Sequence, residues 1–170
     1  MAQDISLKII QEVFRQIRPI PGRFESIDND QGFSVMVDYA HTDDALTKAI
    51  SAAKTFTEGK LIVVFGCGGN RDASKRPQMT AIAQSIADRV ILTADNPRKE
   101  NLDNIIADMQ SNSDAASKEL VVVEIDRSKA IEIALAELDE QDLLLIAGKG
   151  HEAYQDIDGI THPYSDEAVL

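Results

Sequence analysis

Residues 61–72 read LIVVFGCGGNRD, and this stretch decides the fold. Five consecutive apolar residues are followed at once by glycines and then by polar side chains. A short and fully apolar run of this kind is typical of a strand that is buried on both faces, as in a parallel sheet. Glycines at its end allow a tight turn and a close approach of the backbone. The stretch therefore predicts a central parallel strand, residues 61–65, that leads into a loop at the edge of the sheet.

Outward from this strand, the pattern of an amphipathic helix followed by an apolar strand recurs along the chain. The expected pairs are a helix at 43–56 with a strand at 61–65, a helix from about 77 with 89–93, about 102–109 with 120–123, and about 128–138 with 143–146. Before them, two extended segments, 24–27 and 33–38, are separated by turn-forming residues and predict a hairpin. Apolar strands that alternate with helices require a parallel sheet with both faces covered. We therefore expect an α/β fold, namely a doubly wound, Rossmann-like, mostly parallel sheet with helices on both faces.

The N-terminal residues precede this repeated pattern. An apolar stripe predicts a helix that is capped by Asp4 or Ser6 and runs to about Arg18, after which two prolines end it. We expect residues 1–19 to be a lead-in helix and linker from a preceding domain. Residues 20–170 are expected to form one domain, because their length is typical of a single hydrophobic core.

The composition excludes several classes of protein. The net charge of -12 argues against nucleic acid as a partner, because binding to a phosphate backbone requires clustered Lys and Arg. No apolar run approaches the ~20 residues that a membrane helix needs, so no membrane partner is expected. One cysteine and an N-terminus without the layout of a signal peptide indicate the cytoplasm.

Three polar loops, at 66–76, 94–98 and 148–154, follow strands of the predicted parallel sheet. They should gather at one edge, where sheets of this class bind ligands. In the first loop, glycines can bring backbone N–H groups close to an anionic ligand, although a plain tight turn explains the glycines about equally well. Arg71 in this loop can present its planar fork to a carboxylate, and a solvated surface arginine is the plainer alternative.

The other two loops offer groups of both charges. Residues 95–98 read DNPR and combine a carboxylate, an amide, a rigid ring and a guanidinium. Turn capping explains Asn before Pro, and a fixed turn also orients a recognition arginine. In the third loop, Glu152 is an acceptor for an ammonium group, whereas His151 is interpreted as structural.

Residues 38–42 read DYAHT and lie where a strand meets a helix. They could hold the ribose hydroxyls or a phosphate of a nucleotide, and an N-cap at Thr42 explains them at least as well. Cys67 lacks a partner cysteine and a spacing to histidine that would indicate a metal site, so we assign it to packing.

Seven motifs occur together in this chain. A single one of them would not identify a family, but the set in this order does. They are PGR at 21–23, VDYAHT at 37–42, FGCGGNRD at 65–72, KRP at 75–77, DNPR at 95–98, AGKGHE at 147–152 and YSD at 164–166. Jointly they resemble the C-terminal domain of the Mur ligases over nearly the whole chain from about Ile20 onward. The resemblance implies that residues 20–170 are a Mur ligase C-terminal domain.

The resemblance also implies a reaction. It points to an ATP-dependent amide ligase that adds meso-2,6-diaminopimelate to UDP-N-acetylmuramoyl-L-alanyl-D-glutamate in peptidoglycan precursor synthesis, after phosphorylation of the D-glutamate carboxylate. The distal end of diaminopimelate carries an ammonium and a carboxylate, whereas lysine lacks that carboxylate and would leave a guanidinium unpaired. The family's amino-acid site corresponds here to Arg71, Asp95, Asn96, Pro97, Arg98, Gly148 and Glu152.

On the nucleotide side, the resemblance implies contacts from Arg23, Asp38 and His41, with Asp38 near the ribose. Two residues depart from the family pattern. Asp43 stands where relatives usually have Pro, and Asn70 stands where Asp is usual. Both departures concern the nucleotide-side loop and leave the proposed amino-acid contacts intact.

The sequence contains no Gly-x-x-x-x-Gly-Lys-Ser/Thr, the loop that binds ATP phosphates in this family. We therefore expect ATP and Mg²⁺ to be bound mainly by a central domain, and the UDP-sugar by further domains, all missing from these residues. No catalytic residue or metal ligand is assigned, and the isolated chain is expected to be inactive. One alternative is a stand-alone module that binds diaminopimelate or muropeptides without catalysis. Another is a nucleotide-dependent oxidoreductase, although Arg71 occupies the third glycine position of the dinucleotide fingerprint.

Overall fold

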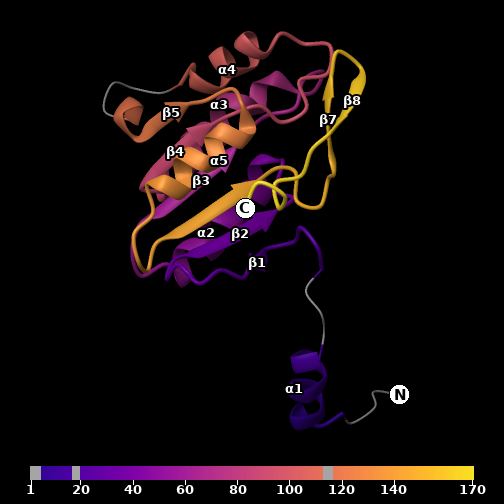
Figure 1. Cartoon of the computed structure of the whole chain (residues 1–170), viewed down its shortest axis with the longest axis vertical. Coiled ribbons are helices and arrows are strands. Elements are labelled where there is room, and N and C mark those ends of the chain that lie inside the picture. Colours follow the sequence, from indigo (N-terminus) through magenta and orange to yellow (C-terminus); the bar gives the residue numbers. More distant parts are fainter. Residues whose placement is uncertain (1–4, 17–19, 113–116) are drawn as a thin grey trace.

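The computed structural model describes residues 5–16, 20–112 and 117–170 and contains a six-stranded sheet (Figure 1). The strand order is β1-β2-β6-β3-β4-β5, in which β1 is antiparallel to β2 and all other neighbours are parallel. The strands are β1 (Glu25–Ile27), β2 (Ser34–Asp38), β3 (Leu61–Phe65), β4 (Arg89–Leu92), β5 (Val121–Val123) and β6 (Leu143–Ala147). The prediction of an α/β, mostly parallel sheet is confirmed, as is the hairpin of β1 and β2.

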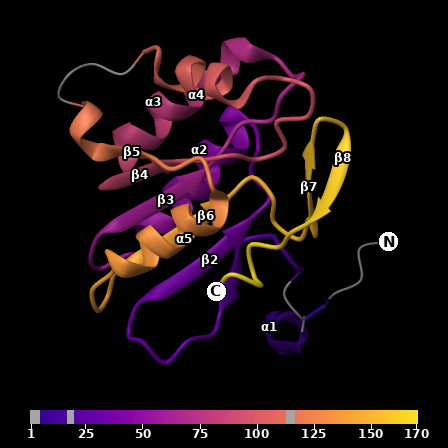
Figure 2. The same ribbon diagram turned by 45° about the horizontal axis from the view of Figure 1, so that its top comes forward.

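Helices cover both faces of the sheet (Figures 1 and 2). The helices are α2 (Asp43–Phe56), α3 (Arg76–Ile86) and α4 (Leu102–Gln110) on one face, α5 (Arg127–Ala136) on the other, and the short 3-10 turns η1 (Ala73–Lys75) and η2 (Ser117–Leu120). Leu61, Val63 and Phe65 of β3 pack with α2, α3 and α4. Ile62 and Val64 point the other way and pack with α5. Because β3 is buried on both faces, its sequence has to be apolar throughout, and the doubly wound arrangement is confirmed.

The carboxyl ends of four neighbouring strands lie in one row. In the register of the sheet, Asp38 of β2 pairs with Ala147 of β6, which also pairs with Phe65 of β3. Phe65 in turn pairs with Leu92 of β4. The loops that follow these residues therefore begin side by side at one edge of the sheet, as the sequence predicted.

A second hairpin lies outside the predicted elements. It consists of β7 (Tyr154–Ile157) and β8 (Ile160–Pro163), and Figure 1 shows it in yellow beside the main sheet. The residues between the strands, Asp158 and Gly159, have φ values of +55° and +77°. A two-residue type I′ turn requires positive φ at both positions and favours Asp-Gly. This dipeptide is the sequence signal that could have located the hairpin.

Helix α1 (Leu7–Gln16) stands apart from the sheet, and none of its side chains is buried (Figures 1 and 2). The backbone N–H of Ile9 donates to the carbonyl of Ser6 at 3.0 Å, so the helix begins near the predicted cap. Asp4 and Arg18, the other predicted limits, lie outside the described residues. The division of the chain into a lead-in helix and one domain stays a prediction. Among the described residues, no helix has the length and apolarity needed to span a membrane.

Candidate functional site

A cavity of about 580 Å³ lies at the edge of the sheet where the three polar loops meet the segment that follows β2. The predicted site residues that line it are His41, Arg71, Asp95, Asn96, Arg98, Gly148 and Glu152. Pro97 lines a neighbouring cavity instead, and Arg23 and Asp38 lie outside both linings. The fold therefore brings together most of the predicted amino-acid contacts from three separate strand ends.

Asn96 connects these strand ends through its amide. Its Oδ1 accepts hydrogen bonds from Nζ of Lys149 at 3.1 Å and from the backbone N–H of Asp156 at 3.0 Å. Its Nδ2 donates to Oε2 of Glu152 at 3.0 Å. These three contacts fix the orientation of the amide, with oxygen toward the lysine and nitrogen toward the glutamate. Asn96 thus joins the loop after β4 to the loop after β6 and to β7.

Asp95 is buried, and its Oδ1 has no hydrogen-bond partner among the described residues. Its Oδ1 lies 3.4 Å from Nζ of Lys149, which is an ion pair without a hydrogen bond. Buried carboxylates normally accept several hydrogen bonds, because an unsatisfied buried acceptor costs free energy. Asp95 lines the cavity, so its carboxylate adds negative charge to the wall of the cavity.

Lys149 is a member of this cluster to which the sequence analysis assigned no role, although the motif at 147–152 contains it. It is fully buried, and its Nζ donates to the carbonyl of Tyr154 at 2.7 Å. It also lies 3.4 Å from Oε2 of Glu152. Lysine is almost never fully buried unless its charge is paired. The sequence signal is only a lysine between two glycines after a buried strand, and the acidic partners appear only in the folded chain.

The conformation of Arg98 depends on the hairpin of β7 and β8. Its backbone has φ of +54°, in the left-handed region that side chains other than Gly, Asn and Asp rarely adopt. The N–H of Arg98 donates to the carbonyl of Asp156 at 2.9 Å, and its carbonyl accepts from the N–H of Asp158 at 2.7 Å. The guanidinium donates to the carbonyl of Gly69 at 2.9 Å and lines the cavity. The hairpin therefore holds the arginine in a conformation that the loop alone would not favour.

Two glycines of the first loop are explained by contact with the second loop. A Cβ on Gly66 would lie 2.4 Å from the carbonyl oxygen of Thr93, and one on Gly69 would lie 1.9 Å from that of Pro97. The N–H of Gly69 donates to the carbonyl of Asn96 at 2.9 Å. The alternative of a tight structural turn is thus confirmed for Gly66 and Gly69, because the close approach is to protein backbone.

Arg71 and Asn70 follow these glycines at the cavity. Arg71 is exposed, and none of the described residues forms an ion pair or hydrogen bond with its guanidinium. Asn70 has φ of +54°, a conformation that asparagine tolerates better than most residues. Its Oδ1 accepts from the N–H of Lys99 at 3.2 Å. The departure at Asn70 from the family pattern is therefore compatible with the local backbone, and Arg71 is free to bind an anion.

Arg76 connects the first loop to the residues that follow the second loop. It is 2% exposed, and its two terminal nitrogens donate to the two carboxylate oxygens of Glu100 at 2.6 and 2.7 Å. The same guanidinium donates to Asp108 at 2.8 Å and to the carbonyl of Gly68 at 3.3 Å. The hydrogen bonds from Arg76, and then that from the N–H of Asn70, lower the pKa of Glu100 to about 2.

The lowered pKa of Glu100 makes its contribution to stability depend on pH. The contribution is fully present above the unfolded pKa of about 4.3 and is lost as the pH falls toward 2. We therefore expect the native protein to be more stable than Glu100→Gln near neutral pH, and this difference to shrink as the pH falls through that window. Urea unfolding of both proteins over a series of pH values measures it, with the exposed Glu140→Gln as a control. A difference that stays constant down to the acid end would refute the assignment.

Tyr39 links the predicted nucleotide side with the amino-acid side. The guanidinium carbon of Arg23 lies 4.3 Å from the centre of the Tyr39 ring, within the range of a cation–π contact. The Tyr39 hydroxyl donates to Oε1 of Glu152 at 3.5 Å, and the exposed ring of His41 packs edge-on at 4.7 Å. Burial, followed by the charge of Glu152, raises the pKa of Tyr39. Sequence reasoning gave Tyr39 no role, although it lies between two predicted contacts.

Asp38 and Thr42 hold the local backbone. The two carboxylate oxygens of Asp38 accept from the N–H groups of Phe24 at 2.7 Å and Ala40 at 2.8 Å. The Thr42 hydroxyl accepts from the N–H of Ala45 at 3.3 Å and caps α2. The alternative of a helix cap at Thr42 is therefore confirmed, and Asp38 already has a structural role at the end of β2.

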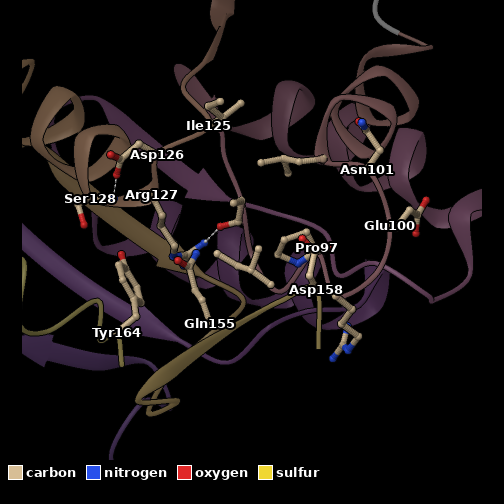
Figure 3. Close-up of a pocket in the computed structure, with 14 residues that line it drawn as sticks. Pro97, Glu100, Asn101, Ile125, Asp126, Arg127, Ser128, Gln155, Asp158 and Tyr164 are labelled. Carbon is tan, nitrogen blue, oxygen red and sulfur yellow. Dashed lines mark hydrogen bonds between the residues drawn. The ribbon is translucent and has the colours of Figure 1, made fainter. Parts of the chain in front are cut away.

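A second cavity, of about 600 Å³, adjoins the same loop, and Figure 3 shows its lining. Its side chains come from the second loop, the start of α5 and the hairpin. The charged groups at the start of α5 are already engaged: Asp126 accepts from the N–H of Ser128 at 3.0 Å, and Arg127 is bound as described next. The first cavity is therefore the better candidate for a ligand site, because Arg71 there has no ion-pair or hydrogen-bond partner among the described residues and the two carboxylates of Asp95 and Glu152 share one lysine.

Arg127 is buried beneath the second and third loops and contacts the backbone at the base of each. Its Nε and Nη2 donate to the two carboxylate oxygens of Asp166 at 2.7 and 2.8 Å, and both side chains are fully buried. Its Nη1 donates to the carbonyl of Ala94 at 3.3 Å and its Nη2 to that of Ala147 at 3.0 Å. Ala94 is the first residue of the second loop, and Ala147 directly precedes the third loop. One buried ion pair therefore holds both loops at their bases.

Cys67 packs against Met79, with 3.8 Å between the sulfur atoms. Burial raises the pKa of its thiol to about 12, so the thiol stays protonated and has no nucleophilic role. Within the described ranges, no group of three or more His, Cys, Asp or Glu side chains is placed to hold a metal ion.

The fold and the cavity define the class of protein: an α/β domain with a cavity at the carboxyl edge of its parallel sheet, where proteins of this class bind ligands. Within this class the chain belongs to the Mur ligase family, because the family model described as "Mur ligase, glutamate ligase domain" matches residues 22–150. The resemblance inferred from the motifs is thereby confirmed. Family membership leaves no support for the oxidoreductase alternative.

Two similar proteins are named UDP-N-acetylmuramoyl-L-alanyl-D-glutamate–2,6-diaminopimelate ligase. The one from Clostridioides difficile (strain 630) is 46% identical over 161 residues, which are 95% of this chain and 33% of the relative. The one from Coxiella burnetii (strain RSA 493 / Nine Mile phase I) is 47% identical over 151 residues, 89% of this chain and 30% of the relative. The chain thus spans about a third of the length of these relatives.

Solved structures agree with this assignment. A structure of a ligase with the same name is 39% identical, has a TM-score of 0.82, and is matched over 97% of this chain and 34% of that one. A folylpolyglutamate synthase from Thermotoga maritima is 22% identical with a TM-score of 0.60, over 85% of this chain and 31% of that one. At that identity the second similarity shows the fold alone.

Proposed function

We propose that this chain is the amino-acid-selecting C-terminal domain of an ATP-dependent ligase. The ligase would add meso-2,6-diaminopimelate to UDP-N-acetylmuramoyl-L-alanyl-D-glutamate, as the names of the relatives state for them. One observation carries the proposal: the cavity combines the carboxylates of Asp95 and Glu152, which share a single buried lysine, with the exposed guanidinium of Arg71 and that of Arg98. This arrangement suits a ligand that bears an ammonium and a carboxylate on the same carbon.

The charges of the cavity account for the choice between diaminopimelate and lysine. The distal ammonium would bind Asp95 and Glu152, and the distal carboxylate would bind Arg71 and Arg98. Lysine has no distal carboxylate, so both guanidinium groups would lose their anionic partner. Each lost hydrogen bond between charged groups costs about 1.5–3 kcal/mol, so lysine is expected to bind at least about tenfold more weakly than diaminopimelate.

ATP would supply the phosphoryl group that activates the D-glutamate carboxylate. Arg23 and His41 fit as contacts on the nucleotide side, because both are exposed and lie against Tyr39 at the rim of the cavity. Asp38 fits less simply, because both of its oxygens already accept backbone hydrogen bonds. Mg²⁺ and the UDP-sugar would be held by other domains, so the isolated chain is expected to be inactive. We place the enzyme in the cytoplasm.

A stand-alone binding module for diaminopimelate or muropeptides would present the same cavity. The relatives favour the ligase over this alternative, because almost the whole chain aligns with a third of each of them. The two functions share the ligand but differ in activity. A module would bind diaminopimelate whether or not an ATP-binding domain accompanied it.

The test is a titration of this chain with meso-diaminopimelate and, separately, with lysine, followed by NMR. We expect diaminopimelate to shift the amide signals of the three loops, and lysine at the same concentration to shift them much less. The variant Arg71→Gln serves as a control, because it should reduce the response to diaminopimelate specifically. Equal responses to the two amino acids would refute the proposed selection.

A further inference from the structure

We propose that Lys149 determines the specificity of the site by setting its charge, an inference that rests on the proposed function and extends it. Lys149 does not line the cavity. Its side chain is fully buried and contacts Asp95, Asn96 and Glu152, which do line the cavity. The residue would therefore act through the groups that touch the ligand, as a positioning residue.

The contacts of Lys149 hold its ammonium group in one position. Nζ donates to the carbonyl of Tyr154 at 2.7 Å and to Oδ1 of Asn96 at 3.1 Å. The carboxylates of Asp95 and Glu152 each lie 3.4 Å away. These acceptors come from the loop after β4, the loop after β6 and the start of β7. Since a lysine has three N–H donors, the cluster uses the whole ammonium group inside the protein.

The charges of this inner cluster explain why the lysine matters. Asp95 and Glu152 carry two negative charges, and Lys149 neutralises one of them. The remaining charge of −1 matches a single ligand ammonium. Removal of the lysine would leave two uncompensated carboxylates side by side, which repel each other and attract cations in general. The inner cluster would then be less suited to a zwitterion and better suited to a simple cation.

The same ammonium also orients Asn96. With its Oδ1 held by Lys149 and by the N–H of Asp156, the amide can only direct Nδ2 toward Glu152. This hydrogen bond in turn fixes the Glu152 carboxylate at the cavity. Without Lys149 the Asn96 amide loses its charged donor. Glu152 then loses its ion pair with the lysine, and its hydrogen bond from Asn96 is less well oriented. The loss of the Lys149 charge and the loss of the Asn96 orientation should therefore both weaken the binding of diaminopimelate.

Diaminopimelate and lysine should respond differently to the loss of this charge. A more negative cavity repels the distal carboxylate of diaminopimelate and weakens its pairing with Arg71 and Arg98. The side chain of lysine ends in an ammonium alone, so it suffers no such repulsion. The ratio of kcat/KM for diaminopimelate to kcat/KM for lysine should therefore fall when Lys149 is neutralised.

The test uses a full-length ligase that carries this domain, with Lys149→Gln and Lys149→Met compared with the native enzyme at saturating ATP. Glutamine removes the charge but keeps an N–H donor group on a side chain that is one atom shorter, whereas methionine removes both the charge and the donors. We expect the ratio to fall about tenfold or more in both variants, mainly through a higher KM for diaminopimelate. Lys149→Arg should retain more of the ratio than either. The exposed Lys129→Met is the matched control and should leave the ratio unchanged.

The outcomes separate this inference from the proposed function. If kcat/KM for both amino acids falls by the same factor, Lys149 is merely structural and the inference is overturned. A ratio in Lys149→Gln equal to that of the native enzyme would overturn the role of charge in the same way. If the native enzyme itself does not prefer diaminopimelate to lysine, the proposed function fails, and the inference fails with it.

Discussion

In a full-length ligase that carries this domain, Arg98→Asn is expected to raise the KM for meso-diaminopimelate by about 10- to 100-fold. A hydrogen bond to a charged group contributes about 1.5–3 kcal/mol, and each 1.4 kcal/mol corresponds to about a factor of ten. The KM for ATP should change little, because the proposed function assigns Arg98 to the binding of diaminopimelate and not of ATP. Asparagine is chosen because the backbone of Arg98 has φ of +54°, which asparagine tolerates, so that the effect reports the lost guanidinium and not strain.

Two further variants separate the effects of charge and geometry at this position. Arg98→Lys keeps a positive charge but lacks the planar fork, so an intermediate KM is expected. Lys99→Ala removes the neighbouring exposed cation and should leave the KM for diaminopimelate unchanged. Initial rates with each substrate varied in turn supply the values. An equal rise in the KM for ATP and for diaminopimelate would show that Arg98 does not select the amino acid.

The main features of the fold could be predicted from the sequence because they follow from local patterns. The apolar run at 61–65 and the similar run at 143–146 are buried on both faces, which is the reason for their composition. The helix at 43–56 has the expected bounds, since a threonine caps it and an apolar stripe faces the core. Strand ends of a parallel sheet share one edge, so the meeting of the three loops could also be predicted.

The supports of the site could not be predicted in the same way. The burial of Lys149 depends on Asp95, which is far from it in the sequence and adjacent only after β4 and β6 take their places beside β3. The backbone partners of Arg98 lie on a hairpin about 60 residues further along the chain. An Asp-Gly pair marks the turn of that hairpin, but nothing in the pair indicates where the hairpin docks.

The glycines of the first loop show how one pattern can have two explanations. In the sequence, a ligand-binding loop and a tight structural turn both require glycine after a buried strand. In the structure, Gly66 and Gly69 contact the backbone of the second loop. The loop therefore contributes to the site through the exposed Arg71 and through the position that it imposes on residues 95–98.

The largest effect on stability is expected for Asp166→Asn. Arg127 and Asp166 are separated by 39 residues in the sequence and form an ion pair whose side chains are both 0% exposed. Removal of one charge from a buried pair leaves the other uncompensated and typically costs about 3–5 kcal/mol. For a chain of this size, the midpoint of thermal unfolding should then fall by about 6–20 °C. Urea unfolding gives the free energy directly. Asp139→Asn is the control, because its pair with Lys60 is exposed to solvent and should contribute much less to stability.

A double variant tests whether the pair also holds the loops. Replacement of a buried ion pair by apolar residues is often neutral, so Arg127→Met with Asp166→Leu would restore stability if the charges were all that mattered. Arg127 also donates to the carbonyls of Ala94 and Ala147, however, and methionine cannot. We therefore expect only partial recovery of stability, together with a higher KM for diaminopimelate in a full-length ligase, because those carbonyls lie at the bases of the second and third loops, which are proposed to bind it. Full recovery of stability with an unchanged KM would show that the pair is a local feature of the core without influence on the site.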